Sequence, residues 1–130
     1  CLKDATGDMA NAIDVLRRCG DRITLLSGDD FTTLPFLSLG GSGVISVASN
    51  LVPEKMTALV KAARSGRTVE ARQVSDDLFP LFQALFLESN PIPAKAAMAH
   101  MGLLADELRL PLTSMSAGPR ETLLRVLAAL

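Results

Sequence analysis

The feature that most constrains the fold is the alternation of helical segments and short apolar runs in the first half of the chain. Apolar residues recur at helical spacing over residues 8–19, and Gly20 supplies a stop, which predicts a helix marked by Met9, Ile13 and Leu16. The apolar run 23–26 is too short for a helix and predicts a buried strand. A shorter helix over residues 31–39 and a strand over residues 44–47 follow.

The next segment continues this alternation. Pro53 stands at a position typical of a helix start, and the predicted helix runs to residue 65 before Gly66. Leu2 reads as the last residue of a further strand, so strand ends are expected at Lys3, Ser27 and Val47. Strands and helices joined by short connections form parallel βαβ units. Residues 1–66 are therefore predicted to be α/β, the last βα units of a TIM barrel.

Three strands are too few to close a barrel. A complete α/β barrel usually needs about 250 residues, and an unclosed parallel sheet exposes hydrophobic edges. The chain also opens with Cys1 rather than Met. We therefore expect the amino-terminal half of the barrel, about 150 residues, to belong upstream of this sequence.

The second half of the chain is predicted to be helical. Helices are expected over residues 68–87, 94–101 and 119–130, with a kink at Pro80 in the first of them. A rigid turn over residues 90–93 separates the first two, and Leu110-Pro111-Leu112 reads as extended. These helices do not continue the strand alternation, so residues 67–130 are predicted to form an appended C-terminal helical bundle.

Composition excludes several classes of function. The formal net charge is −1, with 13 basic and 14 acidic residues, and Tyr and Trp are absent, which argues against nucleic-acid binding. No apolar stretch approaches the roughly 20 residues of a membrane-spanning helix. Cys1 and Cys19 form neither a disulfide framework nor a metal spacing, which favours a reducing, cytoplasmic location. His100 has no partner at ligand spacing, so no metal is expected.

Lys3 is the most informative candidate residue. Active-site residues of α/β barrels lie at the carboxyl ends of strands, which here precede the loops 3–8, 27–30 and 48–50. An amine at a strand end would point into the barrel mouth, where partial burial disfavours the ammonium form and frees a nucleophile for imine formation. From position alone, a surface lysine near a chain end is the better interpretation.

Two other clusters have ordinary structural interpretations. Gly40-Gly41-Ser42-Gly43 could cradle a phosphate, but the glycines precede a strand, which favours a helix stop and a tight turn. Asp29 and Asp30 resemble a catalytic carboxylate pair, but one of them capping the helix at Phe31 is the simpler interpretation.

A resemblance changes the interpretation of Lys3. The stretch around it resembles the Schiff-base lysine segment of the dihydrodipicolinate synthase family, here Leu2-Lys3-Asp4-Ala5-Thr6-Gly7-Asp8. Four further segments match the family in order, namely residues 25–30, 40–47, 86–95 and 108–112. One short motif would be weak evidence, but an ordered set across nearly the whole chain favours Lys3 as the catalytic amine.

The resemblance implies a reaction and a set of roles. Lys3 would condense with pyruvate, and the resulting enamine would attack aspartate semialdehyde, in lysine and diaminopimelate biosynthesis. The imine is the electron sink, so no cofactor is implied. The main-chain carbonyl of Ile45 would face pyruvate, Gly28 would line the same pocket, and Asn90 would contact the second substrate. The family also implies a homo-oligomer, usually a tetramer.

Some family features are missing from this sequence. The family's relay tyrosine and its substrate-binding arginine precede the lysine, and this chain has no Tyr. The chain alone is therefore not expected to turn over. Two alternatives stay open: a sister pyruvate lyase or aldolase, such as N-acetylneuraminate lyase, and a non-catalytic half-barrel assembly module. Apolar residues of the second half suggest an oligomer interface, unless they simply cover the barrel: Leu78, Phe79, Phe82 and Phe86.

Overall fold

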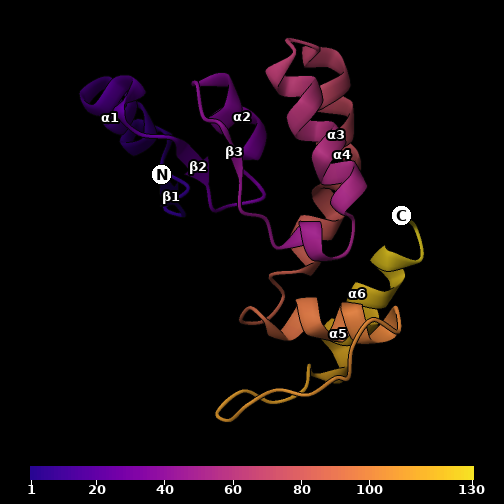
Figure 1. The fold of residues 1–130 in the computed structure, drawn as a ribbon. Coiled ribbons are helices and arrows are strands. Elements are labelled where there is room, and N and C mark those ends of the chain that lie inside the picture. Colours follow the sequence, from indigo (N-terminus) through magenta and orange to yellow (C-terminus); the bar gives the residue numbers. More distant parts are fainter. The chain divides into compact units, whose positions relative to one another are not determined.

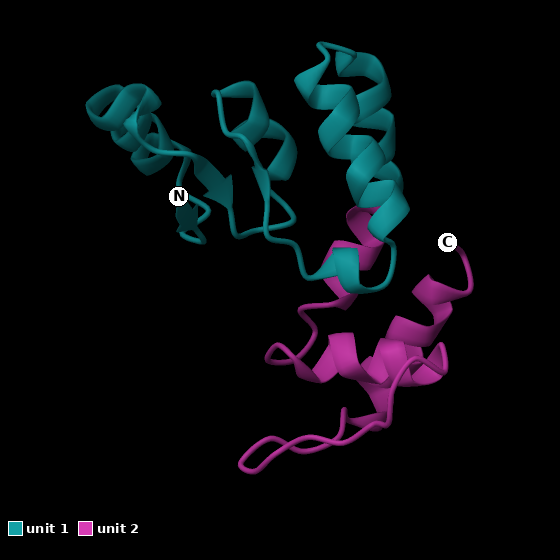
Figure 2. Ribbon diagram, viewed as in Figure 1, with its two compact units in different colours: residues 1–77 teal, residues 78–130 magenta.

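A computed structural model describes all residues, 1–130, and divides into two compact units, Cys1–Asp77 and Leu78–Leu130 (Figure 2). The first unit contains all the strands, and the second contains only helices, turns and loops without regular secondary structure (Figure 1). The division falls inside the helix α4 (Thr68–Ala84). The predicted domain boundary between residues 66 and 67 stays a prediction.

The first unit is built on a parallel sheet. Its strands are β1 (Leu2–Asp4), β2 (Leu25–Ser27) and β3 (Gly43–Val44), hydrogen-bonded in the order β1-β2-β3. In the register, Lys3 lies opposite Leu26, and Ser27 lies opposite Val44. The predicted parallel α/β arrangement is confirmed, with α1 and α2 as the connections between successive strands.

The strands are shorter than predicted, and their bounds differ. β2 begins two residues later than the apolar run 23–26, and β1 ends at Asp4 rather than Lys3. The prediction of a strand over residues 44–47 was wrong beyond Val44. The chain instead turns into the 3₁₀ helix η2 (Ala48–Asn50), because the N–H groups of Val47 and Ala48 bind a side-chain carboxylate rather than a neighbouring strand.

The helix α1 (Met9–Cys19) confirms the helix predicted over residues 8–19. Asp8 caps it by accepting hydrogen bonds from the N–H groups of Ala10 and Asn11 at 2.8 and 3.3 Å. A 3₁₀ turn, η1 (Gly20–Arg22), follows it. The buried side of α1 runs through Ala12, which packs with Leu25 and Phe36, and Met9, Val15 and Leu16 pack partly against them. Ile13, expected on that side, is instead 48% exposed.

Two further helices complete the first unit before α4. The helix α2 (Thr33–Ser38) is shorter than the predicted 31–39, and α3 (Pro53–Arg64) begins at Pro53 as predicted and contacts α2. Gly40, at φ +106°, begins the turn that leads into β3, so the interpretation of residues 40–43 as a helix stop and turn is confirmed. Gly41 packs directly against the buried ring of Phe36.

The second unit holds the end of α4, then α5 (Ile92–His100) and α6 (Ala117–Leu127), which pack on each other. Both begin two residues earlier than predicted. Residues 110 and 111 form a turn, where an extended segment over residues 110–112 was predicted. Of the four apolar residues proposed for an interface, Leu78 and Phe82 are buried, whereas Phe79 and Phe86 are about half exposed.

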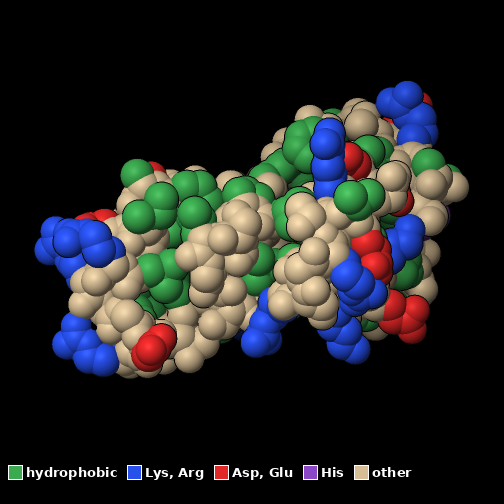
Figure 3. Space-filling model, turned by 90° about the horizontal axis from the view of Figure 1, so that it is seen from above, with side chains coloured by type: hydrophobic (Ala, Val, Ile, Leu, Met, Phe, Trp, Pro, Cys, Tyr) green, Lys and Arg blue, Asp and Glu red, His purple; other side chains and the backbone are tan.

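The surface carries no continuous basic stripe on the face drawn in Figure 3. Lys and Arg side chains form separate groups there, with Asp and Glu beside several of them, and hydrophobic side chains lie between (Figure 3). None of the helices is long and apolar enough to cross a membrane.

Candidate active site

The carboxyl ends of the three strands lie at one edge of the sheet, and each is followed by a loop that hydrogen bonds to its neighbour. The Gly28 N–H donates to the carbonyl oxygen of Asp4 at 2.6 Å, and the Ile45 N–H donates to the carbonyl oxygen of Ser27 at 2.8 Å. These two bonds extend the parallel ladder past the strands. They place the backbones after Lys3, Ser27 and Val44 in successive contact, which is where barrel enzymes carry their active sites.

The side chain of Lys3 lies across Gly28. A Cβ atom added to Gly28 would lie 2.5 Å from Cε of Lys3 and 2.7 Å from Cβ of Ala5. Carbon atoms in contact normally lie about 3.5–4.0 Å apart, so only glycine leaves room for the lysine stem. Two residues predicted from sequence to share a site are therefore brought together, and Lys3 runs along the loop edge toward the end of β2.

The expected partial burial of Lys3 is not found. Lys3 is exposed, as is Leu2 before it. The physical reason is the open edge of the sheet: β1 pairs with β2 on one side and with no strand on the other. Burial of the amine would require further structure against that edge.

The buried Asp4 anchors the loop that follows Lys3. Its carboxylate accepts hydrogen bonds from the Thr6 hydroxyl at 2.6 Å, the Thr6 N–H at 2.9 Å and the Asn11 side-chain amide at 3.0 Å. The bond from the Thr6 hydroxyl is the largest cause that lowers the pKa of Asp4, and its N–H and the Asn11 amide act in the same direction against burial. Asp4 thus stays ionised and ties Lys3 to the start of α1.

Neither Asp29 nor Asp30 caps α2 with its side chain, although one of them was predicted to do so. Asp29 holds the turn just before α2, since its Oδ2 accepts from the Thr32 N–H at 3.0 Å and the Thr32 hydroxyl at 2.6 Å. Asp30 is 2% exposed and does not cap α2. Its Oδ2 accepts from the N–H groups of Val47 and Ala48 at 3.0 and 2.9 Å, far along the chain.

Sequence reasoning missed the roles of both Asp4 and Asp30. For Asp4 a signal existed, because an aspartate two residues before a threonine is typical of a local turn closed by the carboxylate. For Asp30 there was none, because its partners lie 17 and 18 residues away in sequence.

The comparisons with known proteins connect this geometry to a family. Residues 1–130 match the sequence model described as the "Dihydrodipicolinate synthetase family". The chain belongs to this family. It is 49% identical over 126 residues to the 4-hydroxy-tetrahydrodipicolinate synthase of Syntrophus aciditrophicus, which covers 97% of this chain and 43% of that protein.

Solved structures agree with this membership of the dihydrodipicolinate synthetase family. The dihydrodipicolinate synthase of Aquifex aeolicus superposes with a TM-score of 0.95 at 42% identity, covering 97% of this chain and 43% of that one. The Acinetobacter baumannii enzyme, solved in complex with pyruvate, gives 0.93 at 35% identity, covering 98% and 44%. The chain thus spans less than half the length of the relatives it matches. These relatives do not favour N-acetylneuraminate lyase or a non-catalytic module.

The remaining predicted residues of this family member are placed as follows. Ile45 lies directly after β3, with its side chain 47% exposed and its N–H bound to Ser27. Asn90 is exposed in the turn before α5 and belongs to the second unit, whereas Lys3 and Gly28 belong to the first. No three His, Cys, Asp or Glu side chains are grouped so as to hold a metal ion.

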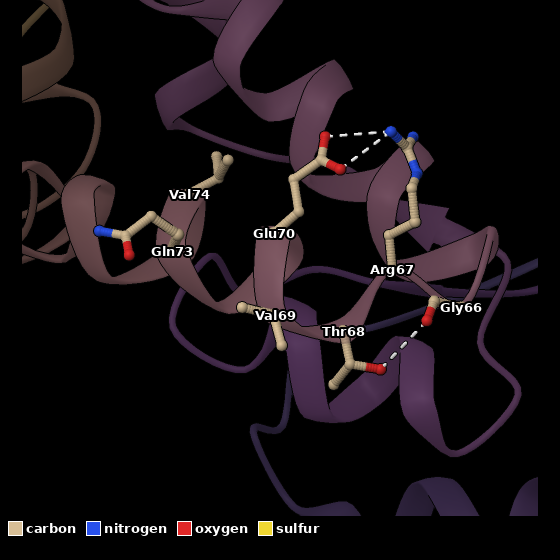
Figure 4. A pocket seen from close by; sticks show the side chains of 7 residues that line it. All are labelled: Gly66, Arg67, Thr68, Val69, Glu70, Gln73 and Val74. Atoms are coloured by element: carbon tan, nitrogen blue, oxygen red, sulfur yellow. Dashed lines mark hydrogen bonds and ion pairs between the residues drawn. The ribbon is translucent and has the colours of Figure 1, made fainter.

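A hollow at the turn between α3 and α4 is not part of this site. It is lined by residues 66–70, 73 and 74, and none of the four predicted site residues reaches it (Figure 4). Its charges are already paired, because Arg67 donates to both carboxylate oxygens of Glu70 at 3.1 and 2.9 Å, and the Thr68 hydroxyl donates to the Gly66 carbonyl. We therefore assign it no ligand.

Proposed function

We propose that this chain is the lysine-bearing, carboxy-terminal part of a 4-hydroxy-tetrahydrodipicolinate synthase and that Lys3 forms the imine with pyruvate. The observation that carries the proposal is the passage of the Lys3 stem over Gly28 at the carboxyl edge of the parallel sheet. The 49% identity to a protein of that name supports the substrate assignment.

The proposed chemistry follows from an amine at that edge. The Lys3 nitrogen attacks the ketone carbon of pyruvate, and loss of water gives the cationic imine, which draws electrons from the neighbouring methyl carbon. Loss of a proton from that methyl group yields the enamine. The enamine carbon then attacks the aldehyde of aspartate semialdehyde, whose oxygen takes up a proton, and the imine on Lys3 is restored. The amino group that came with aspartate semialdehyde attacks the imine carbon, which closes the ring and releases the Lys3 amine.

The other residues of this chain would shape the pocket. Gly28 leaves the space that the Lys3 stem occupies, and it would line the pocket of the bound keto acid. The main-chain carbonyl of Ile45 would face pyruvate, and Asn90 would contact the second substrate. The imine supplies its own electron sink, so the reaction as proposed uses no metal or organic cofactor.

The rest of the barrel would come from an upstream segment. Relatives are more than twice as long as this chain, and the sheet has an open edge beside β1 with Leu2 exposed there. We propose that the upstream part closes a (β/α)₈ barrel, that residues 1–66 are its last units, and that residues 67–130 form an appended helical bundle. The 130 residues alone would then be inactive, since the relay tyrosine and the arginine for the second substrate lie upstream.

Assembly and location are part of the same proposal. The half-exposed Phe79 and Phe86 support a homo-oligomer, proposed to be a tetramer. The free thiols of Cys1 and Cys19 fit a reducing compartment, and we place the enzyme in the cytoplasm.

The test is covalent trapping. A completed barrel is made by joining this chain behind the amino-terminal part of the Syntrophus aciditrophicus relative, and it is treated with pyruvate and borohydride. Mass analysis of the peptides should find the reduced adduct on Lys3. Lys3→Ala should abolish it, whereas Lys61→Ala, an exposed lysine on α3, should not. An adduct that persists in Lys3→Ala, or none in the unmutated barrel, contradicts the proposal.

Substrate choice is tested on the same protein. The completed barrel should consume aspartate semialdehyde in the presence of pyruvate and should not cleave N-acetylneuraminate. Cleavage of the sugar acid without synthase activity would identify the sister lyase instead.

A further inference from the structure

The side chain of Asp30 connects two loops at the carboxyl edge of the sheet. Asp30 follows β2, and its Oδ2 accepts hydrogen bonds from the N–H groups of Val47 and Ala48, which follow β3. These are the N–H groups at the start of η2, which have no partner within that short helix. The carboxylate therefore fixes the point at which the chain leaves β3 and turns toward α3.

Only Ile45 and Ser46 lie between the end of β3 and this anchor. At one end, the Ile45 N–H is held by the carbonyl oxygen of Ser27 at 2.8 Å. At the other end, Ser46 accepts two hydrogen bonds from Ser49: its hydroxyl accepts from the Ser49 N–H at 2.8 Å, and its carbonyl accepts from the Ser49 hydroxyl at 2.9 Å. The direction of the Ile45 carbonyl is thus set by bonds on both sides of it.

The anchor is a buried carboxylate with one oxygen unsatisfied. Asp30 is 2% exposed, and its Oδ1 is buried without a hydrogen-bond partner. A buried oxygen without a hydrogen-bond partner destabilises the fold, so the presence of a carboxylate at position 30 calls for an explanation. A charged acceptor binds N–H groups more strongly than a neutral one, and here it binds two in the segment beside the proposed keto-acid site.

We infer that Asp30 is a positioning residue for keto-acid binding: its carboxylate orients the Ile45–Ser46 backbone against which pyruvate binds. The inference rests on the proposed function, because it takes Lys3 as the amine and the Ile45 carbonyl as a wall of the pocket. Asp30 does not itself contact the substrate. It acts through the backbone between β3 and η2.

The inference predicts a change in affinity rather than in the chemistry at Lys3. In the completed barrel, the rate of borohydride trapping is measured against pyruvate concentration for the unmutated protein and for Asp30→Asn. The amide keeps the shape and one acceptor oxygen but loses the charge. The pyruvate concentration for half-maximal trapping should rise about tenfold, since charge-assisted hydrogen bonds are roughly twice as strong as neutral ones. The maximal trapping rate should stay within about threefold, because the hydrogen bonds of Asp30 do not involve Lys3.

Asp29→Asn is the matched control. Asp29 is the adjacent acid and also accepts two hydrogen bonds, but both come from Thr32 within its own loop. The half-saturating pyruvate concentration of the Asp29→Asn barrel should therefore stay within about threefold of that of the unmutated barrel. Asp30→Ser, which removes the charge and the unpartnered oxygen together, provides the same measurement if the asparagine variant does not fold.

An unchanged half-saturating pyruvate concentration in the Asp30 variant that folds would overturn the inference, as would an equal rise in Asp29→Asn. Failure of the proposed function would give a different result, because the unmutated barrel would then form no adduct on Lys3. The inference about Asp30 would be refuted by that result as well.

Discussion

Replacing Gly28 by alanine is the most direct perturbation of the proposed site. The new Cβ would lie 2.5 Å from Cε of Lys3, where carbon atoms need about 3.5 Å, so the lysine stem has to move by about 1 Å. The loop cannot absorb the clash instead. The same Cβ would lie 2.7 Å from Cβ and 3.1 Å from Cα of Ala5, whose backbone is tied to Gly28 through the Asp4 carbonyl.

The size of the effect follows from that displacement. Misplacing a reacting group by 1 Å can reduce the rate about 10²-fold, so borohydride trapping of pyruvate on Lys3 should slow about a hundredfold in Gly28→Ala. The measurement is the single-turnover trapping rate at saturating pyruvate in the completed barrel. The amount of folded protein is checked by circular dichroism.

Gly43→Ala is the matched control in the neighbouring strand. Its new Cβ would meet nothing closer than Cδ2 of Leu26, at 3.4 Å, which is an ordinary contact with a flexible side-chain end. Its trapping rate should stay within about threefold of the unmutated protein. A Gly28→Ala protein that folds and traps pyruvate at the normal rate would refute the argument that Gly28 is needed for the path of the lysine stem.

Two predictions concern stability rather than reactivity. Gly41→Ala would put a Cβ 2.3 Å from a ring carbon of the buried Phe36, so the free energy of unfolding, measured in urea, should fall by about 1–3 kcal/mol, whereas Gly118→Ala, with no atom within 4 Å, should not destabilise. The pKa of Asp4 is lowered, chiefly by the Thr6 hydroxyl, so its stabilisation is present above the unfolded pKa of about 4 and is lost as the pH falls through the lower folded value. Urea midpoints measured from pH 7 to pH 3 should therefore fall less steeply in Asp4→Asn than in the unmutated chain, and equal slopes would contradict this assignment.

The features that could be read from sequence are those with a local cause. The α1 helix and its stop at Gly20 follow from periodicity and glycine, and the order strand, helix, strand follows from short apolar runs between them. The pairing of Lys3 with Gly28 depended on the family motif rather than on periodicity. Periodicity could not predict this contact, because Lys3 and Gly28 lie on two segments whose alignment is set by the sheet register, with Lys3 opposite Leu26.

What could not be read from sequence depends on partners distant along the chain. The β-branched apolar residues Ile45 and Val47 after Val44 make this segment read as a strand, but the carboxylate of Asp30 binds the N–H groups of Val47 and Ala48, where the strand pairing stops. Ile13 continues the helical periodicity of α1, yet the core closes around the smaller Ala12, and the larger side chain is left exposed. Periodicity identifies apolar residues on one side of a helix, but it does not show which of them this chain's own core buries.

The geometry of the candidate site and its chemical environment have different origins. Position is local: Lys3 is held by the bonds of Asp4 to Thr6 and Asn11 and by its packing over Gly28, all within residues 1–28. Removal of water from the amine is not local, because the free edge of β1 leaves Lys3 exposed. A lysine becomes an effective nucleophile at neutral pH when burial or a neighbouring cation disfavours its ammonium form. In the proposed function, this chain supplies the position of the amine, and its reactivity would depend on further structure placed against the open edge of the sheet.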